Sequence, residues 1–135
     1  MKDLDAIKQL ADQHKEELGF VLRPALQKAV TDQELFVAET DKEIVGFVHY
    51  HHRRDQQTTL YHIAVRATYQ RQGIGAALIK TLHAEASRLG KSHILLKCPM
   101  ELAANRFYSQ CGFSLYGTSN GKRRPLNVWM LPVRS

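Results

Sequence analysis

Apolar positions repeat with a helical period over the first part of the chain. The residues that carry this period are Leu4, Ile7, Leu10, Ala11 and Leu18. They predict an amphipathic helix, with Asp3 or Asp5 as its N-terminal cap and Gly19 as its end. A second helix is expected from about Pro24 to Val30, because proline is favoured in the first helical turn.

The pattern changes to that of strands at Glu34. Residues 35–39 and 44–50 are rich in β-branched and aromatic side chains, and the turn residues Thr40-Asp41-Lys42 between them predict a hairpin. The polar stretch from His51 to Gln57 is expected to be a loop, and residues 58–65 are expected to form a third strand.

Residues 59–97 predict a strand, a helix and a second strand. The buried side of the helix, which is expected from Ala76 to Leu89, consists of Leu78, Ile79, Leu82, Ala86 and Leu89, and Gly90 ends it. A short strand at 93–97 follows, and a strand–helix–strand unit makes its two strands parallel. A helix from Glu101 to Gln110 and strands at 114–118 and 127–131, joined by a turn at 119–122, complete the chain.

Composition is that of an ordinary globular protein. The 135 residues are 44% hydrophobic and 24% charged, which fits a single domain over residues 1–135. No apolar run approaches the roughly 18 residues that span a bilayer, and the first residues have no apolar signal segment, so no membrane partner is expected. Cys98 and Cys111 lack metal-like spacing and are expected to be reduced, which favours a cytoplasmic location.

The net charge of +6, from 19 Lys and Arg against 13 Asp and Glu, favours an anionic partner. Nucleic acid is one candidate and a phosphate-bearing cofactor is another. No recognition-helix or aromatic RNA-binding motif accompanies the charge, so nucleic acid is the weaker of the two.

The segment Gln70-Arg71-Gln72-Gly73-Ile74-Gly75-Ala76 lies between a predicted strand and a predicted helix. Glycines there allow the backbone to approach a ligand, and the helix start offers unpaired N–H groups and the positive end of a dipole. These features predict an anion site suited to phosphates, with a plain strand-to-helix turn as the alternative. Two glycines do not make a Rossmann fingerprint, and no Gly-Lys-Ser/Thr ends the segment as in a P-loop.

Two motifs in this order resemble the GNAT (GCN5-related N-acetyltransferase) superfamily. Gln70-x-x-Gly73-x-Gly75-Ala76 is similar to its pyrophosphate loop, and Phe107-Tyr108-x-x-x-Gly112-Phe113 is similar to its second motif. The resemblance covers about residues 3–131, and the wording is nearest to the ribosomal-protein N-terminal acetyltransferase branch. It implies an α/β (α+β) fold: a mixed six- to seven-stranded sheet, about four flanking helices and a splayed parallel strand pair at the cofactor cleft.

The resemblance also implies an acetyl-CoA site and an acetyl transfer, by direct attack, to a primary amine of a small molecule or of a protein or peptide. No metal is expected. The pantetheine arm would pair with backbone groups of Ile63, Ala64 and Val65. The residues expected at the pyrophosphate are Gln70, Arg71, Gln72, Gly73, Ile74, Gly75 and Ala76. Tyr108 would give a proton to the leaving thiolate, a core position being its alternative. Asn105, on the helix face expected to carry Glu101, Ala104 and Tyr108, would contact the cofactor in place of the family's Asn, which is Glu101 here.

No general base carries over from the family. The ribosomal-protein branch uses a Glu where this chain has Lys97, and the base positions of other members hold Tyr61 and Thr59. His62 is a candidate substitute, although strand alternation places it on the opposite face from these two residues. A packing or polar-face role for His62, with a water chain as the proton acceptor, is the alternative.

Other features leave alternatives open. The run from His49 to Arg54 is expected to line the acceptor groove rather than to bind zinc. Lys122-Arg123-Arg124 is expected to be a solvated hairpin loop, with a contact to nucleic acid or to the cofactor's 3′-phosphate as the alternative. Only Met1-Lys2 precede the first helix, where the family usually has a strand, which leaves the sheet edge and a possible homodimer undecided. A non-catalytic acyl-CoA-binding module and a nucleic-acid-binding domain are the competing functions.

Overall fold

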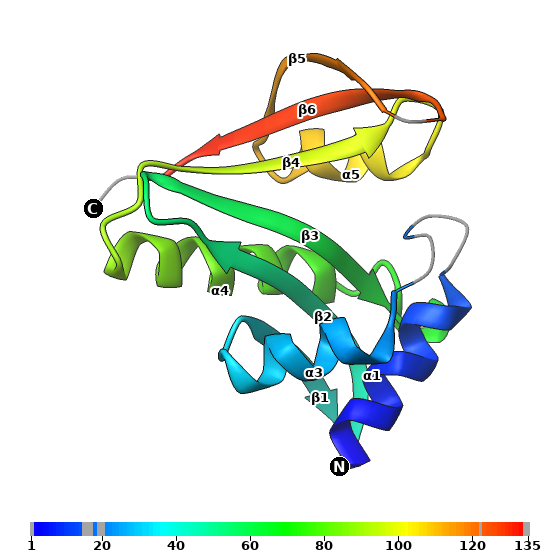
Figure 1. Cartoon of the computed structure of the whole chain (residues 1–135). Coiled ribbons are helices and arrows are strands. Elements are labelled where there is room, and N and C mark those ends of the chain that lie inside the picture. Colours follow the sequence, from blue (N-terminus) through cyan, green and yellow to red (C-terminus); the bar gives the residue numbers. More distant parts are fainter. Residues whose placement is uncertain (1, 15–17, 19–20, 122, 134–135) are drawn as a thin grey trace.

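The fold is a single six-stranded sheet whose two halves separate near its middle (Figure 1). This computed structural model describes residues 2–14, 18, 21–121 and 123–133. The strands are β1 (Leu35–Thr40), β2 (Glu43–His52), β3 (Gln57–Val65), β4 (His93–Pro99), β5 (Ser114–Asn120) and β6 (Pro125–Pro132). They lie in the order β1-β2-β3-β4-β6-β5, and only the β3–β4 pair is parallel.

Helices cover both faces of this sheet. On one face α1 (Lys2–Gln13) and α3 (Arg23–Thr31) bury Leu4, Ile7 and Leu26 against Phe47 of β2. On the other face α4 (Ile74–Arg88) and α5 (Ala104–Gln110) pack with β4 and β6 around a second core of apolar side chains. A short 3-10 turn, η1 (Ala67–Tyr69), follows β3. None of the described helices is long and apolar enough to cross a membrane.

Most predicted elements are confirmed, with shifted ends. The helical period from Leu4 to Ala11 is correct, but α1 ends at Gln13 and does not include Leu18. The helix begins at Lys2, so Asp3 and Asp5 lie inside it and neither caps it. Gly19 lies outside the described residues. The predicted loop at 51–57 is shorter, because β2 runs to His52 and β3 begins at Gln57. Asp41 and Lys42 both have positive φ, the geometry of a two-residue hairpin turn.

The second half of the chain needs three corrections. Helix α5 begins at Ala104, so Glu101 lies in the turn that precedes it and not on its face. Leu89 is 44% exposed, because α4 ends at Arg88 before Leu89 can turn toward the core. The connection between the last two strands lies later than predicted, since β5 continues to Asn120 and β6 begins at Pro125.

The parallel pair β3–β4 is joined only at its start. Gln57, Thr58 and Thr59 pair with His93, Ile94 and Leu95, and the strands then diverge. Each strand keeps its other neighbour along most of its length, β2 for β3 and β6 for β4. The divergence therefore opens a gap inside an otherwise continuous sheet, and the later residues of β3 carry backbone groups that no strand on that side pairs.

A β-bulge at Tyr61 reverses which side chains of β3 point to each face of the sheet. His49 pairs with His62 and Tyr50 pairs with Leu60, so Tyr61 is the extra residue. Leu60 packs in the α4 core, whereas Ala64 packs in the α1 core, although both numbers are even. His62 consequently lies on the α1 face together with Thr59, and the prediction that these two residues point to opposite faces was wrong.

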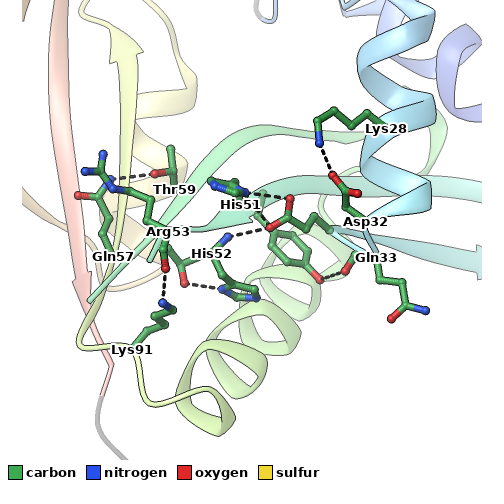
Figure 2. Close-up of polar contacts among 12 residues, drawn as sticks. Lys28, Asp32, Gln33, His51, His52, Arg53, Gln57, Thr59 and Lys91 are labelled. Atoms are coloured by element: carbon green, nitrogen blue, oxygen red, sulfur yellow. Dashed lines mark hydrogen bonds and ion pairs between the residues drawn. The ribbon is translucent and has the colours of Figure 1, made fainter. Parts of the chain in front are cut away.

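A polar network lies at the end of the β2–β3 hairpin where the two strands are connected (Figure 2). The Glu34 carboxylate contacts His51 Nδ1 at 2.8 Å and accepts a hydrogen bond from the His52 backbone N–H at 3.0 Å. His52 Nδ1 lies 2.7 Å from Thr58 Oγ1, and the Tyr50 hydroxyl donates to the Gln33 carbonyl. His51 and His52 thus hold β2 and β3 to the connection between α3 and β1. Neither residue lines the cleft between β3 and β4, so the prediction that they line the acceptor groove was wrong.

Candidate active site

A cavity of about 890 Å³ occupies the cleft where β3 and β4 diverge. Its walls come from the end of β3, the loop to α4, the start of α4, the end of β4 and one face of α5. Of the predicted site residues, the cavity is lined by Ile63, Ala64, Val65, Gln70, Arg71, Gly73, Ile74, Gly75, Ala76 and Tyr108. Gln72 and Asn105 are not in its lining.

The loop at residues 70–76 has the backbone geometry of an anion site. Arg71 (φ 65°) and Gly73 (φ 84°) are both left-handed, and Gly73 is the N-cap of α4 with no side-chain cap bond. The first helical bond that reaches back to this residue is from Ala77 N–H to the Gly73 carbonyl, at 2.9 Å. The amides of Ile74, Gly75 and Ala76 precede it and have no carbonyl four residues earlier within the helix, so they are available to a ligand.

The two glycines of the loop serve different purposes. A side chain at Gly73 would meet nothing within 4 Å, so the positive φ rather than space selects glycine there. A Cβ at Gly75 would lie 3.0 Å from the Phe107 ring, closer than side chains tolerate. Gly75 therefore lets the start of α4 pack against α5 across the cleft.

Gln70 braces the loop against the strand that precedes it. Its side-chain amide donates to the Val65 carbonyl at 3.0 Å and lies 3.5 Å from His14 Nε2. The contact folds the loop back on the end of β3. The motif glutamine thereby shapes the site, a role that its place in the motif does not reveal.

Tyr108 lies on α5 in the cavity wall. It is 8% exposed, and its ring packs edge-on against Phe107 and Phe113 at centroid distances of 5.5 and 5.8 Å. The aromatic contacts hold the ring at one place in the wall. Both expectations for this residue are thus compatible with its position, because it belongs to the core and faces the cleft.

Asn105 points away from the cavity. Its amide donates to the carbonyls of Pro99 and Leu102 at 2.8 and 2.7 Å, and its oxygen accepts from Asn127 Nδ2 and Trp129 Nε1 at 3.0 and 2.9 Å. The side chain joins the β4–α5 turn to β6. The prediction that Glu101, Ala104, Asn105 and Tyr108 share one face toward the cleft was therefore correct for Ala104 and Tyr108 alone.

His62 lines the cavity on the α1 face, and His49 of β2 lies behind it. His49 Nδ1 lies 3.3 Å from His62 Nδ1, and the Tyr61 ring packs 5.2 Å from that of His49. Burial, helped by repulsion from His49, lowers the pKa of His62 to about 4, and burial also lowers the pKa of His49. Both rings are consequently neutral near pH 7, so one can donate a hydrogen to the other.

The charged residues in the described lining of the cavity are all basic: Arg71, Lys97, Arg106 and Arg124. Arg124 is bound to Glu101 at 2.5 Å, at the outer rim. Of the lysine-and-arginine turn predicted at 122–124, Lys122 falls outside the described residues. Among the described residues no group of three or more metal-ligating side chains is placed to hold an ion.

A diverging parallel strand pair with an amide-lined loop and a tyrosine across the cleft is the arrangement expected of an acetyl-CoA-dependent acyltransferase. The family model described as "Acetyltransferase (GNAT) domain" matches residues 31–115, and the chain belongs to this family.

Three known proteins illustrate the similarity. Human N-acetyltransferase 8 is 31% identical over 90 residues, which are 62% of this chain and 40% of that protein. Rv2747 from Mycobacterium tuberculosis, solved in complex with CoA and a second small molecule, is 27% identical with a TM-score of 0.74, over 90% of this chain and 73% of that one. The ribosomal-protein-S18-alanine N-acetyltransferase of Escherichia coli shares the fold at 21% identity and a TM-score of 0.78, over 100% of this chain and 90% of that one.

Proposed function

We propose that the protein is an N-acetyltransferase that moves an acetyl group from acetyl-CoA to a primary amine by direct attack. The observation that carries the proposal is the presence, in one cavity, of the amide-lined loop at the start of α4 and of Tyr108 on α5. The family match and the solved relative with bound CoA support the same donor.

The residues of the cleft fit the donor along its length. The amides of residues 74–76 would hold the pyrophosphate, and Arg71 adds positive charge beside it. Backbone groups of Ile63 to Val65, which β4 no longer pairs, would bind the pantetheine arm. Acetyl-CoA supplies the acetyl group as an activated thioester.

In the transfer, the amine nitrogen forms a bond to the carbonyl carbon and the carbon–sulfur bond breaks. The Tyr108 hydroxyl gives its proton to the departing sulfur. The amine must also lose a proton, and His62 is our candidate acceptor, because it is neutral near pH 7 and stands in the cavity wall on the α1 face.

The test is release of CoA thiol from acetyl-CoA in the presence of a panel of amines. Tyr108→Phe is expected to lower turnover by 10²-fold or more while changing acetyl-CoA affinity little, since general acid catalysis is worth about 10²–10⁴-fold. Tyr116→Phe is the matched control, because Tyr116 is 68% exposed on β5. Failure to bind acetyl-CoA below millimolar concentration would refute the proposal, and unchanged turnover in Tyr108→Phe would remove Tyr108 from the chemistry.

A second candidate is a non-catalytic acyl-CoA-binding module. It is favoured by one observation: the described part of the cavity lining holds no carboxylate that could act as a general base. It predicts acetyl-CoA binding without transfer to any amine, so acetyl transfer above the rate of hydrolysis excludes it. We propose a cytoplasmic location in either case, supported by Cys98 and Cys111, which no disulfide joins.

A further inference from the structure

The diverging strands present two side chains to the same face of the sheet, one from each side of the cleft. Leu96 and Cys98 pack in the α4 core, so alternation along β4 turns Lys97 to the opposite face. The bulge at Tyr61 turns His62 to that face as well. Lys97 and His62 both line the cavity, on the side that α1 covers.

Lys97 lies far from the part of the cleft suited to phosphates. The last parallel pair is Thr59 with Leu95, so Lys97 is about level with Tyr61 along β3. Val65, which precedes the phosphate-type loop, lies four residues further on, or about 13 Å at 3.3 Å per residue. Neutralising the pyrophosphate is therefore a task for Arg71 and the loop amides, and not for Lys97.

The ammonium group of Lys97 has no carboxylate to balance it. Among the described residues no hydrogen bond or ion pair engages Lys97, and the described lining of the cavity contains no Asp or Glu. Of the other cations in the lining besides Arg71, Arg124 is already bound to Glu101, and Arg106 is carried by α5 rather than by β4. Lys97 is exposed on the cavity wall, and a cation that lacks a counter-ion there favours an anionic group on whatever molecule enters beside it.

We infer that the acceptor is an amine that carries a carboxylate, as an amino acid does, and that this carboxylate binds Lys97. The inference rests on the proposed acetyl transfer and names its substrate class. The amine then lies toward His62 and the thioester, while the carboxylate points to β4. Polyamines and aminoglycosides, which are polycations, are poor acceptors by the same argument, because each would place positive charge beside Lys97.

The experiment compares acceptors that differ only in the acid group. L-alanine, L-glutamate and L-phenylalanine are assayed against their α-amides, with spermidine and kanamycin as polycationic probes, by release of CoA thiol. Acid and amide differ in amine basicity, so the acid-to-amide ratio of kcat/KM is measured in wild type and in Lys97→Gln. The quantity of interest is the wild-type ratio divided by the ratio in Lys97→Gln. Amine basicity cancels in this comparison, as in a double-mutant cycle.

Lys97→Gln is expected to lower the acid-to-amide ratio by about 10- to 100-fold, the range that one hydrogen bond to a charged group supplies. Lys97→Glu is expected to reverse the preference and to improve the polycationic probes. Lys80→Gln, on the exposed side of α4, removes the same charge outside the cavity and should leave the ratio unchanged. Calorimetric binding of N-acetyl-L-alanine and its amide to the CoA-loaded protein measures the same preference without turnover.

Two results would overturn the inference. The first is a wild-type preference for amides or polycations. The second is an acid-to-amide ratio that stays the same in Lys97→Gln. Both leave the proposed transferase standing, since they require turnover. No thiol release with any probe, together with no binding of acetyl-CoA, would instead refute the transferase proposal and this inference with it.

Discussion

Replacing Asn105 by alanine separates the two roles that this residue can have. The side chain makes four hydrogen bonds of 3.0 Å or less, two to the carbonyls of Pro99 and Leu102 and two from Asn127 and Trp129. Each such bond contributes about 1 kcal/mol net, so their loss lowers the free energy of unfolding by about 4 kcal/mol. That is a large share of the roughly 5–15 kcal/mol that stabilises a domain.

The measurement is thermal unfolding followed by circular dichroism. For a chain of 135 residues, a loss of 4 kcal/mol lowers Tm by roughly 12 °C. Asn120→Ala is the matched control, because Asn120 is exposed at the end of β5 and makes no side-chain hydrogen bond to another described residue. Its Tm should stay within about 2 °C of wild type.

Acetyl-CoA affinity, measured well below the lowered Tm, completes the test. If Asn105 braces the β4–α5 turn, the folded fraction of Asn105→Ala binds acetyl-CoA within a few-fold of wild type. A tenfold loss of affinity with an unchanged Tm would refute this reasoning. It would restore the interpretation that the motif alone suggested, in which Asn105 contacts the cofactor.

Two further predictions concern the cavity itself. Gly75→Ala should weaken acetyl-CoA binding, because the new Cβ would stand 3.0 Å from the Phe107 ring and force this part of the cavity wall to shift. Gly73→Ala, with no neighbour within 4 Å but a φ of 84°, should act mainly by lowering Tm. The low pKa of His62, about 4 when folded against 6.5 when unfolded, means that the unfolded chain binds more protons between these values. The stability contributed by neutral His62 is therefore complete above pH 6.5 and is lost as the pH falls toward 4. The free energy of unfolding falls by at most about 3 kcal/mol over this range. Urea unfolding should show a smaller loss of stability over the same range in His62→Gln. An equal loss in both proteins would contradict the assignment.

The helix α4, the loop before it and the parallel strand pair could be predicted from the sequence because local rules decide them. The helical period of Leu78, Ile79 and Leu82 predicted the buried face of α4. The two glycines near its start predicted where unpaired backbone amides are exposed. A strand–helix–strand pattern was enough to predict the parallel pair. Each of these features depends on residues that are close together in the chain.

Other features depend on partners far along the chain, and pattern alone could not give them. The partners of Asn105 on β6 are 22 and 24 residues away, so its amide faces the turn rather than the cleft. Glu101 is held by Arg124, 23 residues on, which keeps it at the rim. His51 and His52 were predicted to line an acceptor groove, but Glu34, which lies 17 and 18 residues earlier, engages both of them.

The bulge at Tyr61 explains why the acceptor side is the harder half to infer. A single extra residue in β3 changes which side chains face α1, and a strict period of two cannot anticipate it. Because of the bulge, His62 lies on the same face of the cleft as Lys97. Strict alternation would have placed His62 on the face opposite to Thr59 and Tyr61, the positions compared with the family's base. In the proposed function the donor is bound largely by backbone groups, which this shift scarcely alters. The proposed acceptor instead meets side chains, so its specificity would depend on an irregularity of β3 that the sequence pattern conceals.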